Sequence, residues 1–148
     1  MLSRLMKTSD DHAMLIIRLV LGIVFFAHGA QNMLGWFGGY GFHGTMGFFT
    51  NVMHIPAAFA FLAIIAEFFG ALGLITGFLG RLAAFGIFAV MAVAVLMIHA
   101  HAGFFMNWNG VTPPVEGYEY HLLAMAMALA VMIKGSGSLS VDRMLSKG

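Results

Sequence analysis

The chain has 148 residues, of which 61% are hydrophobic and 9% charged, and its formal net charge is +1. A soluble domain of this length cannot bury so much apolar surface, so the composition predicts an integral membrane protein. The small net charge gives no reason to expect a nucleic-acid partner, and the absence of cysteine excludes disulfides, thiolate metal sites, iron–sulfur clusters and cysteine nucleophiles.

Four apolar segments approach the length of about 20 residues that a helix needs to cross a bilayer. They are residues 13–36, 57–79, 82–102 and 118–134. The first is expected to be a retained helix and not a signal peptide, because Asp10, Asp11 and Arg18 interrupt its apolar run. The last is short and needs the half-polar GYEYH before it to reach across. We therefore predict one all-α domain over residues 1–148, an integral membrane four-helix bundle.

The loop between the first two spans, GYGFHGTMGFFTNVMHIP, is expected to form a helix in its second half. Apolar side chains recur there at helical spacing, and a more polar stripe lies opposite them. The apolar stripe is Phe42, Met46, Phe49 and Met53, and the opposite stripe is His43, Gly47, Thr50 and His54. This pattern indicates an interfacial or re-entrant helix that ends before Pro56.

Apart from Arg18, lysine and arginine are confined to one side of the predicted spans. They occur before the first span, between the second and third, and after the fourth, as Arg4, Lys7, Arg81, Lys134, Arg143 and Lys147. The two opposite loops, residues 37–56 and 103–117, contain neither residue type. Because cytoplasmic loops retain basic residues, both termini are expected to be cytoplasmic.

Ionisable side chains inside a membrane span cost about 2.5–3.5 kcal/mol each, so they usually face the bundle interior and have a function. Glu67 lies near the middle of the second span, and Arg18 lies in the cytoplasmic third of the first. Two interpretations remain open for them. They form a buried ion pair that joins the two helices, or Glu67 serves a bound ligand while Arg18 extends to the surface.

Three further polar side chains lie in the first span. His28, Gln31 and Asn32 are spaced i, i+3 and i+4, so they share one helix face and can share one interior pocket. They either bond to neighbouring helices or donate to the carbonyl of a small aromatic ligand.

The histidines near the loops do not form an obvious metal site. His99 and His101 are two residues apart, as are Glu119 and His121, and such pairs point about 200° apart on a helix. A centre assembled from His28, His99, Glu119 and His121 remains an alternative, with metal handling or transport as its function, but we predict no metal site.

Several stretches together resemble the DoxX family of small four-helix bacterial membrane proteins. The resemblance covers about residues 14–145 and is carried by RLVLGIVFFAHGAQNMLGWFGG, AEFFGALGLITGFLGRLAA, HAHAGFF, GYEYHLL and GSGSLSVDRML. The polar positions that match the family pattern are Arg18, His28, Gly29, Gln31, Glu67, Arg81, His99, Glu119 and Tyr120. Asn32 departs from it, since a lysine is common there, and His101 and His121 lie outside it.

The resemblance implies a small subunit of a membrane oxidoreductase assembly in the bacterial inner membrane. We expect a quinone-binding or quinone-linked integral subunit, with menaquinone or ubiquinone as its cofactor and no haem. Its partners would be the lipid bilayer and a larger membrane redox complex or further copies of the chain. The alternative is a structural or accessory subunit without catalysis of its own.

The candidate residues follow from these expectations. Glu67 and His28 are the candidate catalytic residues, and the expected quinone-binding set is Arg18, His28, Gln31, Asn32, Glu67, His99, Glu119 and Tyr120. In this hypothesis His28 and Gln31 donate to a quinone carbonyl, and Glu67 takes part in proton uptake.

Overall fold

The computed structural model describes residues 5–110, 112 and 116–146, and the regular secondary structure of that part is entirely helical. The long helices are α2 (His12–Leu34), α4 (Ala57–Thr76), α5 (Gly80–Met97) and α6 (Glu119–Lys134). The short elements are η1 (Trp36–Gly38), α3 (Gly41–Gly47), η2 (Phe48–Val52), η3 (His99–Ala102) and α7 (Val141–Ser146). The expectation of an all-α fold is confirmed.

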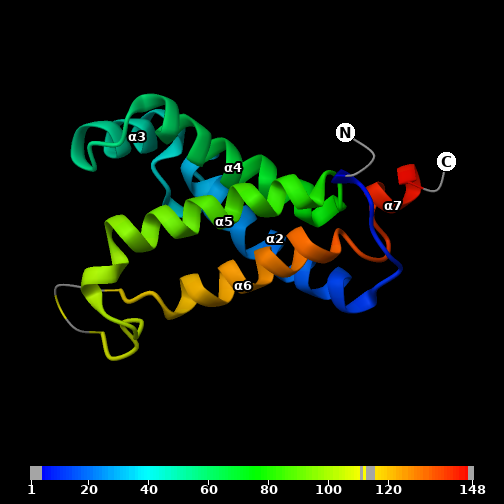
Figure 1. Ribbon diagram of the computed structural model, residues 1–148. Coiled ribbons are helices and arrows are strands. Elements are labelled where there is room, and N and C mark those ends of the chain that lie inside the picture. The colour runs from blue at the N-terminus through cyan, green and yellow to red at the C-terminus, as the bar shows by residue number, and fades with distance from the viewer. Residues whose placement is uncertain (1–4, 111, 113–115, 147–148) are drawn as a thin grey trace.

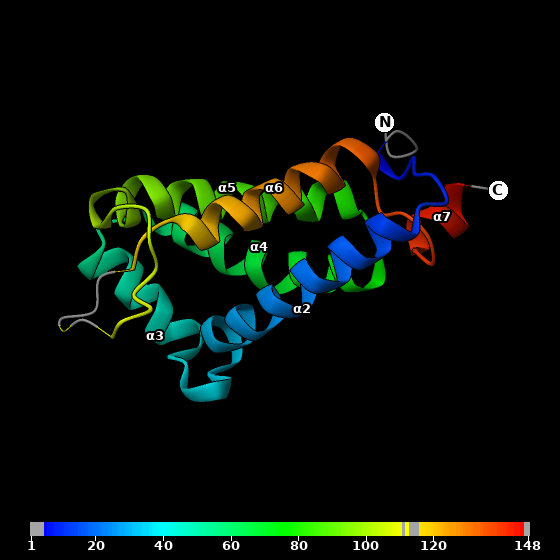
Figure 2. The same ribbon diagram turned by 90° about the horizontal axis from the view of Figure 1, so that it is seen from below.

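The four long helices lie side by side (Figure 1 and Figure 2). Helix α2 packs against α4 and α6, α4 packs against α5, and α5 packs against α6, so the four close into a ring around one core. Helix α7 and the segment before α2 lie at one end of this bundle, which we call the terminal end. Helix α3 and the loop after α5 lie at the opposite end, which we call the loop end.

Three of the helices, α2, α4 and α5, are long and apolar enough to cross a membrane. Many large apolar side chains on them face outward, as expected for surfaces that contact lipid, including Ile23, Phe59 and Leu82. Helix α6 has 16 residues. At about 1.5 Å per residue it is roughly 24 Å long, which is shorter than a hydrocarbon core of about 30 Å.

The helix ends differ from the predicted spans where glycine or an unwound turn intervenes. Helix α2 stops two residues before the predicted end because Gly35 adopts a left-handed conformation (φ 73°) and caps it. Helix α4 ends at Thr76 for the same reason, with Gly77 at φ 69°. Helix α5 ends at Met97, and residues 98–102, which were expected to continue the helix, turn into the 3-10 segment η3.

The first loop contains the predicted helix, which starts earlier than expected, at Gly41, and continues as the π-helical turn η2. It packs against α2 and α4. The apolar stripe, for example Phe42 and Met46, is half-buried, whereas His43 and His54 on the opposite stripe are exposed. The amphipathic pattern in the sequence therefore predicted the helix, but not the face it buries, because Gly47 and Thr50 of the polar stripe are half-buried as well and the buried residue of α3 is Thr45.

The segment after α6 folds back over the terminal end. Ser138 N donates to Asp11 O (3.1 Å), and Asp142 N donates to Gly77 O (2.9 Å). The Asp142 carboxylate accepts from Leu79 N (2.7 Å) and Gly80 N (2.9 Å), which satisfies backbone donors at the start of α5. The segment thus ties α2 to the turn between α4 and α5.

Candidate functional site

A buried carboxyl in the middle of α4 is held by an amide from α2. Glu67 is 8% exposed. Asn32 Nδ2 donates to Glu67 Oε2 at 2.5 Å. The two helices run antiparallel in close contact here, since a Cβ on Gly29 would lie only 2.7 Å from Phe68 Cα. Asn32, one of the three polar side chains on one face of the first span, therefore contacts Glu67 in the second span.

Tyr120 adds a third polar side chain to this region. It lies in the first turn of α6 and packs against the core, within electrostatic range of the Glu67 carboxyl. Its hydroxyl is buried and has no hydrogen-bond partner in the described part of the chain. Leaving a buried hydroxyl unpaired costs free energy, so this donor suits a bound molecule or a water. Asn32, Glu67 and Tyr120 are called the inner polar cluster below.

A histidine pair lies beside this cluster at the loop end. The rings of His99 in η3 and His121 in α6 stack with centroids 4.0 Å apart and planes tilted by 40°. His99 Nδ1 bonds to Glu116 O at 2.7 Å, and because a carbonyl only accepts, this nitrogen carries the hydrogen. His121 is 6% exposed, and its Nδ1 has no partner among the described residues.

The stacked pair is not arranged as a metal site. Two imidazoles that bind one tetrahedral ion at about 2.0–2.1 Å have ring centroids roughly 5 Å apart, farther than the 4.0 Å seen here. No group of three or more His, Asp or Glu side chains in the described residues is placed to hold a metal ion. Unwinding of the helix before Gly103 does occur, but it leaves His101 exposed and brings only His99 onto His121.

The suggested ion pair between Arg18 and Glu67 is wrong. Arg18 is buried, and its guanidinium donates five hydrogen bonds to backbone carbonyls at the terminal end. The acceptors are Leu74 O (2.7 Å), Ile75 O (2.7 Å), Ser136 O (2.7 Å), Ser138 O (3.2 Å) and Leu139 O (2.8 Å). Arg18 also does not extend to the surface. Its hydrogen bonds provide donors for carbonyls in the last turn of α4, which have no partner within the helix, and hold the segment after α6 against the bundle.

The antiparallel register of α2 and α4 explains this correction. Asn32 meets Glu67, and a Cβ on Gly22 would lie 2.9 Å from the Ile75 side chain. Arg18 is one turn beyond Gly22 and therefore reaches the last turn of α4. That position lies about 10 Å along the helix axis from Glu67, at 1.5 Å per residue. Arg18 thus does not join the inner polar cluster.

His28 and Gln31 also lie outside the cluster. His28 is exposed, and its ring lies 6.2 Å from that of Phe25, measured between centroids. Gln31 Nε2 makes a long bond to Phe37 O (3.4 Å) and so stays with the turn after α2. The expected interior pocket shared by His28, Gln31 and Asn32 is therefore not formed, because among the described contacts of these three side chains only that of Asn32 is a hydrogen bond to α4.

Glu119 organises the loop after α5. One of its oxygens, Oε1, accepts from Met106 N (2.9 Å) and from Trp108 Nε1 (2.5 Å). The start of α6 is joined to the same loop by backbone bonds from Tyr118 N to Gly103 O (3.2 Å) and from Glu119 N to Phe104 O (2.9 Å). Glu119 thus stabilises the loop that covers the loop end of the bundle. Its role differs from that of Glu67, which bonds to Asn32.

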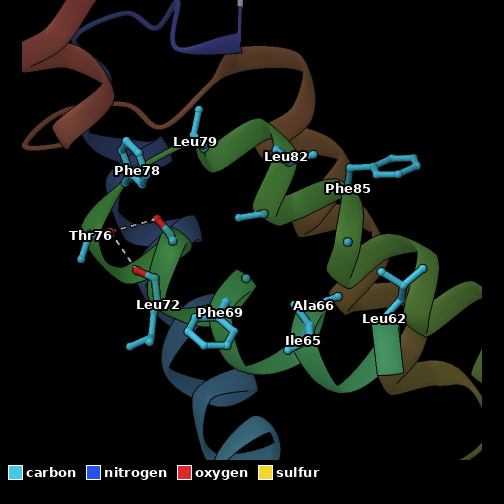
Figure 3. Close-up of a pocket in the computed structure, with 14 residues that line it drawn as sticks. Leu62, Ile65, Ala66, Phe69, Leu72, Thr76, Phe78, Leu79, Leu82 and Phe85 are labelled. Atoms are coloured by element: carbon cyan, nitrogen blue, oxygen red, sulfur yellow. Dashed lines mark hydrogen bonds between the residues drawn. The ribbon is translucent and has the colours of Figure 1, made fainter. Parts of the chain in front are cut away.

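A groove on the outside of the bundle contains none of the predicted site residues. It has a volume of 630 Å³ and runs between α4 and α5, lined by apolar side chains such as Leu62, Phe69 and Phe85 (Figure 3). The Thr76 hydroxyl is bonded to Leu72 O (2.8 Å). The lining offers no free polar group that would distinguish one apolar ligand from another.

The profile of the DoxX family matches residues 13–100, which include α2, α4, α5 and the Asn32–Glu67 contact. The chain belongs to the DoxX family. This confirms the resemblance, and with three helices able to cross a bilayer it identifies the chain as a membrane protein.

Two curated proteins are similar to this DoxX-family chain over nearly its whole length. One is named "Putative oxidoreductase CatD" in Bacillus subtilis (strain 168) and is 28% identical over 97% of this chain and 94% of its own. The other is named "Inner membrane protein YqjF" in Escherichia coli (strain K12) and is 27% identical over 96% of this chain and 98% of its own. No solved structure matches the chain significantly.

His121 was considered in this DoxX-family chain only as a member of an alternative metal centre and was left out of the expected quinone-binding set. A signal was present, because His121 begins the stripe of buried residues in α6 that continues with Ala124, Ala128 and Val131. A histidine at the head of an apolar helix stripe is buried with that stripe. Recognising its contact with His99 required the three-dimensional path of the loop.

Proposed function

We propose that this chain is a quinone-linked integral subunit of a membrane oxidoreductase and that the inner polar cluster binds a quinone head group. The observation that carries the proposal is the buried Glu67 carboxyl, held by Asn32 and accompanied by the unpaired hydroxyl of Tyr120. A similar protein bears the name of an oxidoreductase, and membership of the DoxX family supports a membrane location.

The residues of the cluster fit the chemistry of a quinone. Quinone carbonyl oxygens accept hydrogen bonds, and Tyr120 offers an O–H that no described residue uses. Asn32 spends one amide hydrogen on Glu67 and has a second to donate. Menaquinone and ubiquinone both present such carbonyls, so the cluster does not choose between them.

A bound quinone would supply electron transfer coupled to proton uptake. The role of this chain is then to orient the head group and to hold a proton nearby. Asn32 binds Glu67 Oε2, which leaves Oε1 as the atom at which the carboxyl takes up or releases a proton. Tyr120 would donate from Oη to a carbonyl of the head group. His28 is not part of this arrangement because it lies on the exposed surface.

The proposal is tested by titrating the purified protein with short-chain ubiquinone and menaquinone analogues in detergent, using calorimetry. Tyr120→Phe should weaken binding by about threefold to tenfold, the effect of losing one hydrogen bond of roughly 0.5–1.5 kcal/mol. His28→Ala is the control and should bind as wild type does. Equal affinity of Tyr120→Phe and wild type, or no binding by the wild type, contradicts the proposal.

A structural or accessory subunit is the second candidate, and a specific observation favours it. Arg18, Gln31 and Glu119, three of the expected binding residues, bond to backbone or to the neighbouring loop and so hold the fold together. Under this alternative, Glu67→Gln lowers thermal stability or assembly with partners while quinone affinity stays unchanged. The calorimetric titration of that variant separates the two functions.

We also propose that the chain lies in the bacterial inner membrane with both termini in the cytoplasm. A similar protein is named an inner membrane protein. Among the described residues, the surface lysines and arginines all belong to segments at the terminal end, as Lys7, Arg81, Lys134 and Arg143. Basic residues remain on the cytoplasmic side during insertion, which supports this orientation.

A further inference from the structure

A polar pocket of 350 Å³ opens at the terminal end, away from the inner polar cluster. It is lined by Lys7, Thr8, Ser9, Arg81 and Lys134. These residues come from the segment before α2, the first turn of α5 and the last turn of α6, which lie together at that end (Figure 1 and Figure 2). Because these helices belong to a membrane bundle, their ends lie at the level of the lipid head groups.

Arg81 is held rigidly at the wall of this pocket. Its Nη1 donates to Met132 O and to Ile133 O (3.0 Å), and its Nε and Nη2 donate to Lys7 O (3.3 and 3.1 Å). A guanidinium has five N–H groups, so one hydrogen on Nη2 remains available. All its partners among the described residues are neutral carbonyls, so no carboxylate in that part of the chain pairs with the positive charge of Arg81.

The pocket carries an excess of positive charge. Three of its five lining residues are cations, and none is acidic. The end of α6 contributes about half a negative charge, which offsets only part of this excess. In the described residues the one ion pair joins Arg143 to Asp10 (2.5 Å) and does not involve a lining residue.

The acidic side chains near this end are already engaged. A hydrogen bond from Ser138 Oγ (2.6 Å), together with the charge of Arg143, lowers the pKa of Asp10, so its carboxylate stays ionised and bound to those two residues. Asp11 caps α2 by accepting from Ala13 N (2.9 Å). Asp142 caps α5. The lysine amines in the pocket therefore have no carboxylate of this chain as counter-ion in the described part.

We propose that this pocket binds a phosphate group at the membrane surface. Lys7 and Lys134 would neutralise the charge, and the remaining Nη2 hydrogen of Arg81 would bond to a phosphate oxygen. Thr8 Oγ accepts from Gly137 N (2.7 Å), which leaves its O–H free to donate as well. The head group of an anionic phospholipid and a soluble phosphate share this chemistry, and basic pockets between membrane helices are suited to the former.

The test is native mass spectrometry of the full chain purified with phosphatidylglycerol or phosphatidylcholine, together with thermal unfolding in inorganic phosphate. Lys7→Gln and Lys134→Gln should each lower the fraction that retains phosphatidylglycerol by about fivefold, whereas Lys134→Arg, which keeps the charge, should restore it. The wild type and all three variants should lose phosphatidylcholine during purification. Stabilisation by inorganic phosphate that needs Lys7 and Lys134, without lipid retention, supports the same site with a soluble ligand.

Two results would overturn this proposal. One is equal retention of phosphatidylglycerol by wild type and both glutamine variants, without any phosphate effect that depends on the lysines. The other is the absence of both lipid retention and stabilisation by phosphate in the wild type. Neither result bears on the quinone proposal, because none of the substituted residues belongs to the inner polar cluster.

Discussion

Asn32 Nδ2 and Glu67 Oε2 lie 2.5 Å apart and join α2 to α4 by a hydrogen bond between an amide and a carboxyl in the interior of the bundle. The carboxyl is thus satisfied without an arginine. Since buried polar groups are costly when unpaired, this bond also fixes the relative position of the two helices. Both the function proposed for Glu67 and the structural alternative depend on it.

Replacing Asn32 should therefore destabilise the bundle. Asn32→Ala leaves the Glu67 carboxyl without its donor, and we expect a loss of about 1–3 kcal/mol in the free energy of unfolding. Asn32→Asp should cost more near neutral pH, because it sets two carboxyls against each other. Gln31→Ala is the control, since the Gln31 amide makes only a 3.4 Å bond to Phe37 O. Unfolding in detergent measures the differences, and equal stability of Asn32→Ala and Gln31→Ala would contradict the assignment.

Arg18 and Glu67 should contribute to stability independently. Arg18→Met removes five hydrogen bonds to carbonyls and should cost at least about 3 kcal/mol, since bonds from charged groups contribute about 1.5–3 kcal/mol each. The double variant Arg18→Met, Glu67→Gln should equal the sum of the single variants within about 0.5 kcal/mol. A coupling energy above about 1 kcal/mol between the two substitutions would contradict this prediction and indicate an ion pair. If Arg18→Met does not fold, Arg18→Lys serves in the same cycle.

Gly29 should tolerate no side chain. A Cβ there would lie 2.7 Å from Phe68 Cα, which belongs to the backbone of α4 and cannot move alone. Gly29→Ala should force α2 and α4 apart, at a cost of about 1–3 kcal/mol, and should weaken the Asn32–Glu67 bond with it. Gly47→Ala is the matched control, because the nearest atom to a Cβ at that position is 3.9 Å away. A melting temperature of Gly29→Ala no lower than that of Gly47→Ala would show that the helices are not in close contact.

The orientation can be read with cysteine labelling, for which the chain is well suited because it has no cysteine. Ser9 and Asn109 are exposed at the terminal end and in the loop after α5. In intact cells a membrane-impermeant maleimide should label Asn109→Cys and not Ser9→Cys, and permeabilisation should make both reactive. If only Ser9→Cys is labelled in intact cells, the termini lie outside the cytoplasm and the proposed orientation is wrong.

Local features of the fold followed directly from residue order. The long apolar runs predicted α2, α4 and α5 because a helix in lipid must satisfy its own backbone hydrogen bonds over about 20 residues. The stripe containing Phe42 and Met46 predicted the loop helix, although the residue this helix buries is Thr45. The start of α4 at Ala57, after Pro56, was predicted correctly as well. Such features depend on spacing along one helix, which is visible in a sequence.

Which of the candidate site residues meet could not be predicted from the sequence. Asn32, Glu67 and Tyr120 were selected as polar side chains in or near spans, and the structure joins Asn32 to Glu67 by a hydrogen bond and places Tyr120 within electrostatic range of Glu67. Arg18, His28 and Glu119 were selected by the same reasoning and lie elsewhere. Polarity at membrane depth shows that a side chain needs a partner, but a backbone carbonyl satisfies that need as well as a carboxylate does.

What the sequence determined by itself is the class of the molecule, a helical membrane protein of the DoxX family with a few polar side chains in apolar helices. What only the tertiary structure decided is which of these side chains meet. In the register of α2 against α4, Gly29 packs on Phe68 and Asn32 lies opposite Glu67. The same register places Arg18 beside the last turn of α4. The physical reason is that contacts between helices depend on their relative shift and rotation, which arise from close packing across the whole interface and not from the spacing of residues within either helix.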